Sequence, residues 1–220
     1  MVQANPVNPV DPVNVHRLLI ATRNSHKTRE FAEILGHDFE VRDLTGESEL
    51  PGVKETGATF AQNAIIKARD ISKYFPGLVV GDDSGLEVDV LHGEPGIFSA
   101  RYAGAHASDN ENTEKLLAEI AHSKGKSTRD QARFRCVLAL AKKGQLLQTF
   151  EGVVEGTITR SPRGAGGFGY DPIFRPDGFE QTFAEMPAAV KNRVSHRARV
   201  IAQLAEYLAA REAGYRCAGN

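Results

Sequence analysis

Segments with the pattern of β-strands and segments with the pattern of α-helices alternate along most of this chain. Short apolar or alternating runs, typical of strands, occur at 18–21, 78–81, 86–91 and 132–138, and a stretch rich in Val, Thr and Glu ends near Arg160. Apolar residues spaced three and four apart predict helices around 31–35 and over 59–74, 109–121 and 195–211. This interleaving predicts an α/β fold, and the hairpin-like middle around 142–145 favours a mixed sheet.

Residues 1–15 differ in composition from the rest of the chain. Pro6, Pro9 and Pro12 recur every third residue among Val and Asn, a polyproline-like pattern with little apolar surface to bury. We expect a flexible N-terminal extension here, followed by one folded domain over 16–213 and a short tail over 214–220. The alternative is that the extension is a ligand for a proline-binding domain.

The charge balance excludes partners that are recognised by bulk electrostatics. Lys and Arg number 27 and Asp and Glu number 28, which gives a net charge of −1. This near-neutrality argues against a protein that coats nucleic acid or a polybasic protein that binds membranes. Any polyanion must therefore be bound by a local cluster of cations.

The cysteines and the apolar runs bear on the cellular compartment. Cys136 and Cys217 have neither metal-ligand spacing nor the pattern of a secreted disulfide framework, and Cys136 is expected to pack as a small apolar residue. The longest unbroken apolar run, 136–141, is far shorter than the roughly 20 residues that span a bilayer. The first positive charge is Arg17, so a signal-peptide n-region is missing, and we expect a cytoplasmic protein.

The loop between the first strand and the first helix has features of an anion site. A loop that enters a helix presents free backbone N–H groups and the positive end of the helix dipole. Thr22, Asn24 and Ser25 can donate hydrogen bonds to phosphate oxygens, and Lys27 adds a full charge. The loop lacks the glycines of a Walker A motif. The alternative is an ordinary turn in which Asn24 or Ser25 caps the helix.

Two adjacent carboxylates, Asp82 and Asp83, follow the strand at 78–81 and precede an expected turn at Ser84 and Gly85. Open α/β sheets bind ligands at the carboxyl ends of their strands. Successive strand side chains point to opposite faces, so only one carboxylate is expected to face a given substrate. Carboxylate oxygens suit Mg²⁺, which takes one or two of them together with substrate phosphates. A solvated turn is the alternative.

The helix over 59–74 offers a second wall for such a site. Asn63 and Lys67 are four residues apart and share one face of this helix, and Glu55 lies just upstream as a candidate metal ligand. Taken alone, Lys67 is more typical of a solvated helix residue.

The last helix begins with an unusual concentration of positive charge. Ser195 is the expected N-cap, and His196, Arg197 and Arg199 follow in the first turn, where the helix dipole disfavours cations. A bound anion would relieve this mismatch, and Lys191 adds a charge upstream. An exposed basic turn is the alternative.

The segment 164–172, GAGGFGYDP, contains the letters of a dinucleotide-binding motif but not its context. Such a motif must open a helix, whereas Asp171 precedes a proline and is driven away from helical angles. Small residues around Phe168 and Tyr170 instead favour a loop that a flat ring can approach. We expect either a base stacked on Phe168, with Asp171 nearby, or a simple turn.

Taken together, the motifs resemble those of the inosine triphosphate pyrophosphatase family. The matching stretches appear in the family's order and cover nearly all of 17–210: ATRNSHK, ETGATFAQNAIIKAR, DDSGLEVDVLHGEPGIFSARYAG, QARFRCVLAL, GGFGYDPIF and VKNRVSHR. The resemblance implies a central mixed, strongly twisted sheet flanked by helices, two lobes around a nucleotide cleft, and a homodimer. It implies Mg²⁺-dependent hydrolysis of ITP, dITP or XTP to the monophosphate and pyrophosphate.

The resemblance also implies roles for individual residues. Asp83 would be the general base and, with Glu55, a metal ligand; Lys67 and Ser84 would contact the substrate. The residues that would hold the triphosphate are Thr22, Arg23, Asn24, Ser25, His26 and Lys27. Those that would line the base and sugar pocket are Phe168, Gly169, Tyr170 and Asp171, while Lys191, His196 and Arg197 would contact the base or phosphates. His196 and Arg197 are candidate donors to the 6-keto group, which would discriminate against adenine.

The chain departs from the family's pattern at Arg23, Lys54 and Gln62, where the family usually has a small or uncharged residue, an acid and Glu, respectively. Arg23 could alter phosphate contacts, and the other two the charge around the metal. Two alternatives remain. One is a Maf-like hydrolase of other base specificity, which the SHR and FGYD motifs disfavour. The other is a noncatalytic nucleotide- or RNA-binding module, which the paired acids disfavour. We expect neither a nucleic-acid nor a membrane partner.

Overall fold

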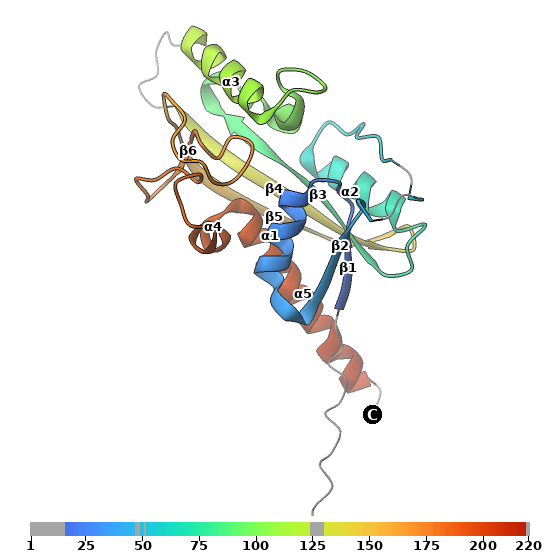
Figure 1. The fold of residues 1–220 in the computed structure, drawn as a ribbon. Coiled ribbons are helices and arrows are strands. Elements are labelled where there is room, and N and C mark those ends of the chain that lie inside the picture. The colour runs from blue at the N-terminus through green and yellow to red at the C-terminus, as the bar shows by residue number, and fades with distance from the viewer. Residues whose placement is uncertain (1–15, 47–48, 51, 124–129, 219–220) are drawn as a thin grey trace, which may run out of the picture.

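The computed structural model describes residues 16–46, 49–50, 52–123 and 130–218, so the predicted extension over 1–15 lies outside the described residues. One mixed sheet organises the chain, with the strand order β2-β1-β3-β4-β5-β6 (Figure 1). Its strands are β1 (His16–Ile20), β2 (Phe39–Asp43), β3 (Leu78–Val88), β4 (Gln131–Lys142), β5 (Gln145–Ile158) and β6 (Phe174–Pro176). The helices are α1 (Ser25–Leu35), α2 (Phe60–Ile71), α3 (Asp109–Ser123), α4 (Ala188–Val194) and α5 (His196–Ala218).

The sheet changes character at β3. The pairs β1–β2 and β1–β3 are parallel, whereas β3, β4, β5 and β6 pair antiparallel. β1 pairs with β3 only up to Ile20 and Val80, and β3 then continues to Val88 beside β4. The fold is therefore α/β with a mixed sheet, as predicted, and the carboxyl end of β1 leaves one edge of β3 open.

The structure corrects one prediction about β3. Ser84 and Gly85 do not form a turn, because β3 is a single strand that pairs with β4 without interruption from Val79 to Val88. Gly85 serves close packing: a Cβ there would lie 2.4 Å from the carbonyl oxygen of Gly96. Asp82 and Asp83 thus lie in the middle of β3, and the strand that ends beside them is β1.

Two apolar clusters occupy different ends of the long strands. The α5 cluster packs α1 and α5 on the even-numbered side chains of β4 and contains Leu18, Phe31, Leu138, Leu140 and Leu204. The α3 cluster, at the other end, contains Leu86, Leu116, Phe134, Phe174 and Phe183. Figure 1 shows β3, β4 and β5 running through both regions. On the opposite face of β4, α2 packs against Val137, Ala139 and Ala141.

Side chains fix the helix starts much as the sequence predicts. Asn24 caps α1 by accepting hydrogen bonds from the backbone N–H of His26 and Lys27, and Ser195 Oγ accepts one from Ala198 at the start of α5. β2 and α4 were not predicted from the sequence, and α5 continues past 214 to Ala218. No helix in the described part of the chain is long and apolar enough to cross a membrane.

Candidate active site

A pocket of about 470 Å³ opens where β1 ends beside β3. Its walls come from the β1–α1 loop, the middle of β3, the 3-10 helix Gly96–Arg101, the loop around Phe168, α4 and the start of α5. It brings together most of the predicted site residues: Thr22, Arg23, Asn24, Lys27, Glu55, Lys67, Asp83, Ser84, Phe168, Gly169, Tyr170, Asp171, Lys191, His196 and Arg197. Ser25 and His26 do not line it.

The β1–α1 loop is organised by its own hydrogen bonds. The Asn24 side chain is used for capping α1, and Thr22 Oγ1 accepts a hydrogen bond from the N–H of Asn24 at 3.1 Å. Arg23 donates to the carbonyl oxygen of Leu44 at 2.9 Å. Lys27 reaches across to form an ion pair with Asp82. These hydrogen bonds hold the loop in one conformation, in which Lys27 lines the pocket.

Asp82 is completely enclosed by partners. Its Oδ2 accepts from Arg197 Nε at 2.9 Å and from the Cys136 thiol at 3.4 Å, and its Oδ1 contacts Lys27. Burial alone would disfavour the carboxylate, but Arg197 and Lys27 outweigh it and hold the pKa of Asp82 well below its usual value. Asp82 is thus an ionised anchor with little capacity to take a proton. The predicted burial of Cys136 is confirmed, with a thiol contact to Asp82 in addition.

Asp83 is different, although it is the next residue. Its Oδ1 accepts from Lys67 Nζ at 2.9 Å, while its Oδ2 is buried and has no hydrogen-bond partner among the described residues. Burial raises the pKa of Asp83, and the charge of Lys67 offsets this only in part. The two carboxylates pair with cations from different elements, as expected for neighbours on opposite faces of a strand.

Glu55 lies next to Asp83 through a shared cation. Lys67 Nζ is 3.3 Å from Glu55 Oε1 as well as 2.9 Å from Asp83 Oδ1. Burial favours the neutral amine, but Asp83 and Glu55 raise the pKa of Lys67 above its usual value, so the ammonium form persists. Within the described ranges, no group of three or more His, Cys, Asp or Glu side chains could hold a metal ion. A metal held here needs ligands beyond these two carboxylates.

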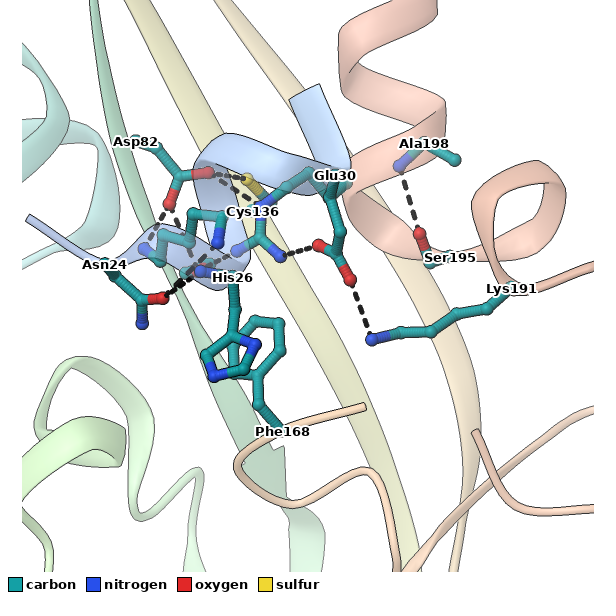
Figure 2. Close-up of polar contacts among 12 residues, drawn as sticks. Asn24, His26, Glu30, Asp82, Cys136, Phe168, Lys191, Ser195 and Ala198 are labelled. Atoms are coloured by element: carbon teal, nitrogen blue, oxygen red, sulfur yellow. Dashed lines mark hydrogen bonds and ion pairs between the residues drawn. The ribbon is translucent and has the colours of Figure 1, made fainter. Parts of the chain in front are cut away.

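A buried ion network supports the other half of the pocket. Arg197 Nη1 is 2.5 Å from Glu30 Oε2, and Lys191 Nζ is 2.8 Å from Glu30 Oε1 and 2.6 Å from Asp171 Oδ2. Figure 2 shows Glu30 reaching Lys191 in this network. Burial opposes ionisation, yet Arg197 and Lys191 lower the pKa of Glu30 to about 2.

The basic first turn of α5 is neither a site that needs a bound anion nor an exposed turn, the two alternatives that its sequence suggested. The charge of Arg197 is met by Glu30 and Asp82 rather than requiring a bound anion, and the side chain is 1% exposed instead of solvated. Arg197 Nη2 also donates to Ser84 Oγ at 2.8 Å. The remaining basic residue, Arg199, is exposed and donates to the carbonyl oxygen of Val153.

The loop around Phe168 forms the aromatic wall. The Phe168 ring stacks on His26 with centroids 5.4 Å apart (Figure 2), and Lys191 Nζ lies 4.9 Å from the ring centroid. The Asp171 carboxylate accepts from the Phe168 N–H at 2.8 Å and so closes the loop. A Cβ on Gly167 would lie 2.1 Å from this carboxylate, and its φ of 72° also favours glycine. The loop opens no helix, as predicted.

His196 and Tyr170 face the same wall. The His196 ring stacks on Phe134 with centroids 4.7 Å apart, and its buried Nδ1 has no hydrogen-bond partner in the part of the chain that the structure describes. Burial, helped by the charge of Arg197, holds the pKa of His196 well below its usual value, so the imidazole is neutral. Tyr170 donates its hydroxyl proton to the carbonyl oxygen of Ser99 at 2.8 Å.

The sequence analysis missed three charged residues of the site. Glu30 lies three residues after Lys27 on α1, a spacing that could have placed both on one face. Asp109 Oδ2 accepts from the Gly169 N–H at 2.6 Å, and Arg101 lines the pocket beside Glu55. Asp109 lies outside every quoted motif, whereas Arg101 lies within the matched stretch DDSGLEVDVLHGEPGIFSARYAG, to which no phosphate role had been assigned at that position.

Comparisons with known proteins show which family this chain resembles over most of its length. The Ham1 family model matches residues 18–207. The dITP/XTP pyrophosphatase of Bacillus licheniformis is 47% identical over 193 residues, which cover 87% of this chain and 97% of that protein. The protein of the same name from Geobacter sulfurreducens is 46% identical over 87% of this chain and 96% of its own length.

Solved structures resemble the whole fold. A HAM1 protein from Coxiella burnetii has a TM-score of 0.80 and 38% identity, covering 89% of this chain and 100% of that one. A nucleoside-triphosphatase, or dITP/XTP pyrophosphatase, from Mycobacterium abscessus has a TM-score of 0.67 and 42% identity over 86% of this chain and 98% of its own.

Proposed function

Because this chain belongs to the Ham1 family, we propose that it hydrolyses the nonstandard purine nucleoside triphosphates ITP, dITP and XTP to the monophosphate and pyrophosphate. Relatives named dITP/XTP pyrophosphatase share up to 47% identity with it over most of its length. The pocket joins an aromatic wall, suited to a base, to a wall rich in cations and carboxylates, suited to a triphosphate.

One observation carries the mechanism: the buried Oδ2 of Asp83 lies without a partner, among the described residues, at the cation-rich wall. A general base needs a free oxygen and a pKa shifted towards the working pH, and burial supplies that shift. Asp83 would take the proton of a water that attacks the α-phosphorus. Lys67 holds the other carboxylate oxygen and fixes its orientation.

Glu55 and Asp83 are the candidate ligands for Mg²⁺. Their oxygens are the ligand type that Mg²⁺ prefers, and a set of two carboxylates fits an ion that completes its shell with substrate phosphates and water. When bound, the ion would neutralise charge that develops on the triphosphate. Lys27 and Lys67 would add fixed positive charge from the protein.

His196 and Arg197 are proposed to select the base. The neutral imidazole of His196 carries one N–H, and Arg197 is locked in place by Glu30, Asp82 and Ser84. A donor held rigidly at this wall would pair with a 6-keto oxygen but would oppose the amino group of adenine. Phe168 would stack on the base once His26 yields its place on the ring.

The decisive experiment measures pyrophosphate release from ITP, dITP, XTP, GTP and ATP with and without Mg²⁺. We expect Mg²⁺-dependent release that is fastest with the first three substrates. Equal rates on ATP would contradict the base selection, preferred release from pyrimidine triphosphates would favour a Maf-like specificity, and binding without release would indicate a noncatalytic module.

We further propose that the chain acts as a homodimer. Two exposed apolar side chains, Tyr74 (63% exposed) and Leu146 (40% exposed), lie at the end of the molecule where Ser72 Oγ accepts from the Gly144 N–H. Light scattering coupled to gel filtration tests this, and a mass near the chain's 23.9 kDa would contradict it. The cytoplasmic location and the lack of nucleic-acid or membrane partners stay predictions.

A further inference from the structure

The cations that line the pocket differ in how strongly they are held by carboxylates. The lining cations are Arg23, Lys27, Lys67, Arg101, Lys191 and Arg197. Four of them contact a carboxylate oxygen at 2.9 Å or less: Lys27, Lys67, Lys191 and Arg197. The N–H groups of Arg23 are directed to the carbonyl oxygens of Leu44 and Leu50. Arg101 differs from all of these, since its contact is a loose one, 3.8 Å from Nη1 to Glu55 Oε2.

The backbone that carries Arg101 is held firmly. Arg101 ends the 3-10 helix Gly96–Arg101, whose Ser99 hydroxyl accepts from the Leu86 N–H at 2.9 Å and donates to the Gly96 carbonyl at 2.6 Å. The carbonyl oxygen of Ser99 accepts from Tyr170 OH. The segment is therefore tied both to β3 and to the base-binding loop, and the freedom of Arg101 is confined to its side chain.

An exposed aromatic ring supports that side chain. The guanidinium carbon of Arg101 lies 5.3 Å from the centroid of Phe98, whose side chain is 53% exposed. A ring face orients a guanidinium group by cation–π attraction without using any of its N–H donors. A separation of 3.8 Å from Glu55 is too long for a hydrogen bond. Arg101 is thus oriented at the pocket, and within the described part of the chain its guanidinium N–H donors make no hydrogen bond and stay available to an anion.

Glu55 connects Arg101 to the reacting end of the pocket. Its Oε1 contacts Lys67, which holds Asp83, and its Oε2 faces Arg101. Lys191 and Arg197 instead lie at the aromatic wall, each close to the Phe168 ring. If Asp83 activates the water that attacks the α-phosphorus, Arg101, on the far side of Glu55, lies where the β- and γ-phosphates would leave as pyrophosphate.

We propose that Arg101 binds the β- and γ-phosphates of the substrate and the pyrophosphate product, exchanging its loose contact with Glu55 for phosphate oxygens. This assignment rests on the proposed function and adds a residue outside the sequence-predicted set. A planar guanidinium group can contact two oxygens of a phosphate at once, which gives a charge-assisted pair stronger than the contact it replaces.

The test compares ligands that differ in phosphate number, using Arg101→Ala, the conservative Arg101→Lys and the matched control Arg175→Ala. Arg175 has a similar exposed fraction (39% against 36%) and also contacts a carboxylate, donating to Glu180 Oε2 at 3.4 Å and to Thr157 Oγ1 at 3.3 Å, but it does not line the pocket. For each protein we would measure kcat and KM for ITP, the inhibition constants of IMP and pyrophosphate, and the binding of pyrophosphate by calorimetry.

For Arg101→Ala we expect KM for ITP and both pyrophosphate constants to rise by about 10- to 100-fold, the size of one lost charge-assisted bond, with the IMP constant unchanged. Arg101→Lys should recover part of the loss, and Arg175→Ala should match the unmodified protein. Equal weakening of IMP and pyrophosphate, or no weakening of either, would overturn the assignment. Should the unmodified protein fail to hydrolyse ITP, the proposed function fails, whereas the calorimetry still decides whether Arg101 binds pyrophosphate.

Discussion

Asp82 and Asp83 are neighbours on one strand, yet they belong to two ion networks of opposite design. The Asp82 network comprises Lys27, Arg197, Glu30, Lys191 and Asp171, and nearly every charge in it has a close buried partner. The Asp83 network comprises Lys67, Glu55 and Arg101, with longer contacts and an unpartnered carboxylate oxygen, as far as the described residues extend.

The difference separates a scaffold from a reactive centre. Complete pairing lowers the pKa of Asp82 and Glu30 and holds Arg197 in one orientation, which suits a rigid wall. Burial raises the pKa of Asp83, because its one close cation, Lys67, offsets the burial only in part, and one of its oxygens has no partner among the described residues, which suits proton transfer. Substitutions in the two networks should therefore affect different observables.

The largest expected effect is on turnover. Asp83→Asn removes the proposed base and should lower kcat for ITP by about 10²- to 10⁴-fold. Because burial raises the pKa of Asp83, the folded protein binds this proton more tightly than the unfolded chain, so the ionised carboxylate opposes folding at neutral pH. Lys67 loses its closer carboxylate but keeps Glu55, so the melting temperature of the variant should fall less than that of Asp82→Asn.

Steady-state pyrophosphate release and thermal melting monitored by circular dichroism measure both effects. Asp70→Asn is the control, because Asp70 is half exposed, pairs with Lys73 and lies outside the pocket. Near-normal turnover by the folded Asp83→Asn protein would contradict the assignment of the base.

Asp82→Asn should act mainly on stability. It removes the carboxylate that pairs with Lys27 and one of the two that pair with Arg197, which keeps Glu30, at a site that is 1% exposed. Breaking a buried pair in this way costs about 3 to 5 kcal/mol. Urea unfolding gives the free energy of unfolding. If Asp82→Asn lowered the free energy of unfolding as little as Asp70→Asn does, the Asp82 network could not be called structural.

The next prediction concerns acid. The pKa of Glu30 falls from an ordinary value of 4.5 to about 2 in the folded protein, so its contribution to stability is present above about pH 4.5 and is lost as the pH falls towards 2. The free energy of unfolding should therefore decrease over this range. In Glu30→Gln the free energy of unfolding should depend less on pH over this range. The same pH dependence in the variant would show that Glu30 is not responsible for the acid destabilisation.

The smallest effect is expected at the edge of the Asp83 network. Phe98→Ala removes the ring beneath Arg101, and an exposed cation–π contact is worth about 0.5 to 1 kcal/mol, or a rise of about two- to fivefold in KM for ITP. Combining it with Arg101→Ala should add nothing further. Additive effects of the two substitutions would mean that Phe98 acts independently of Arg101.

Local patterns predicted the fold class and part of the pocket, such as Asn24, Lys27 and Phe168. The family resemblance supplied the rest, including Arg23, Ser84 and Gly169.

Asn24 and Ser195 are recognisable caps, and Asp82 and Asp83 pair with different cations, as alternation along β3 implies. Both carboxylates nevertheless line the pocket, whereas only one was expected to face the substrate. Residue patterns alone could not predict which of the two carboxylates keeps a free oxygen, since the answer depends on Arg197, 115 positions further along the chain. The choice of Asp83 as the base came only from the family resemblance.

The failures have a similar physical origin. Ser84 and Gly85 have the composition of a turn, but Gly85 is needed because a second backbone segment packs onto the strand. Glu30 has no motif, and its importance follows only from the approach of α5 to α1. Propensity describes neighbours in sequence, whereas these features are set by neighbours in space.

β3 runs without a break from the α5 cluster to the α3 cluster, and the paired carboxylates lie near its midpoint. Because β3 stays paired with β4 from Val79 to Val88, the backbone fixes the spacing of Asp82 and Asp83 relative to both clusters. Packing in either cluster therefore helps to hold the two carboxylates in place, so a core substitution far from the pocket can still disturb them.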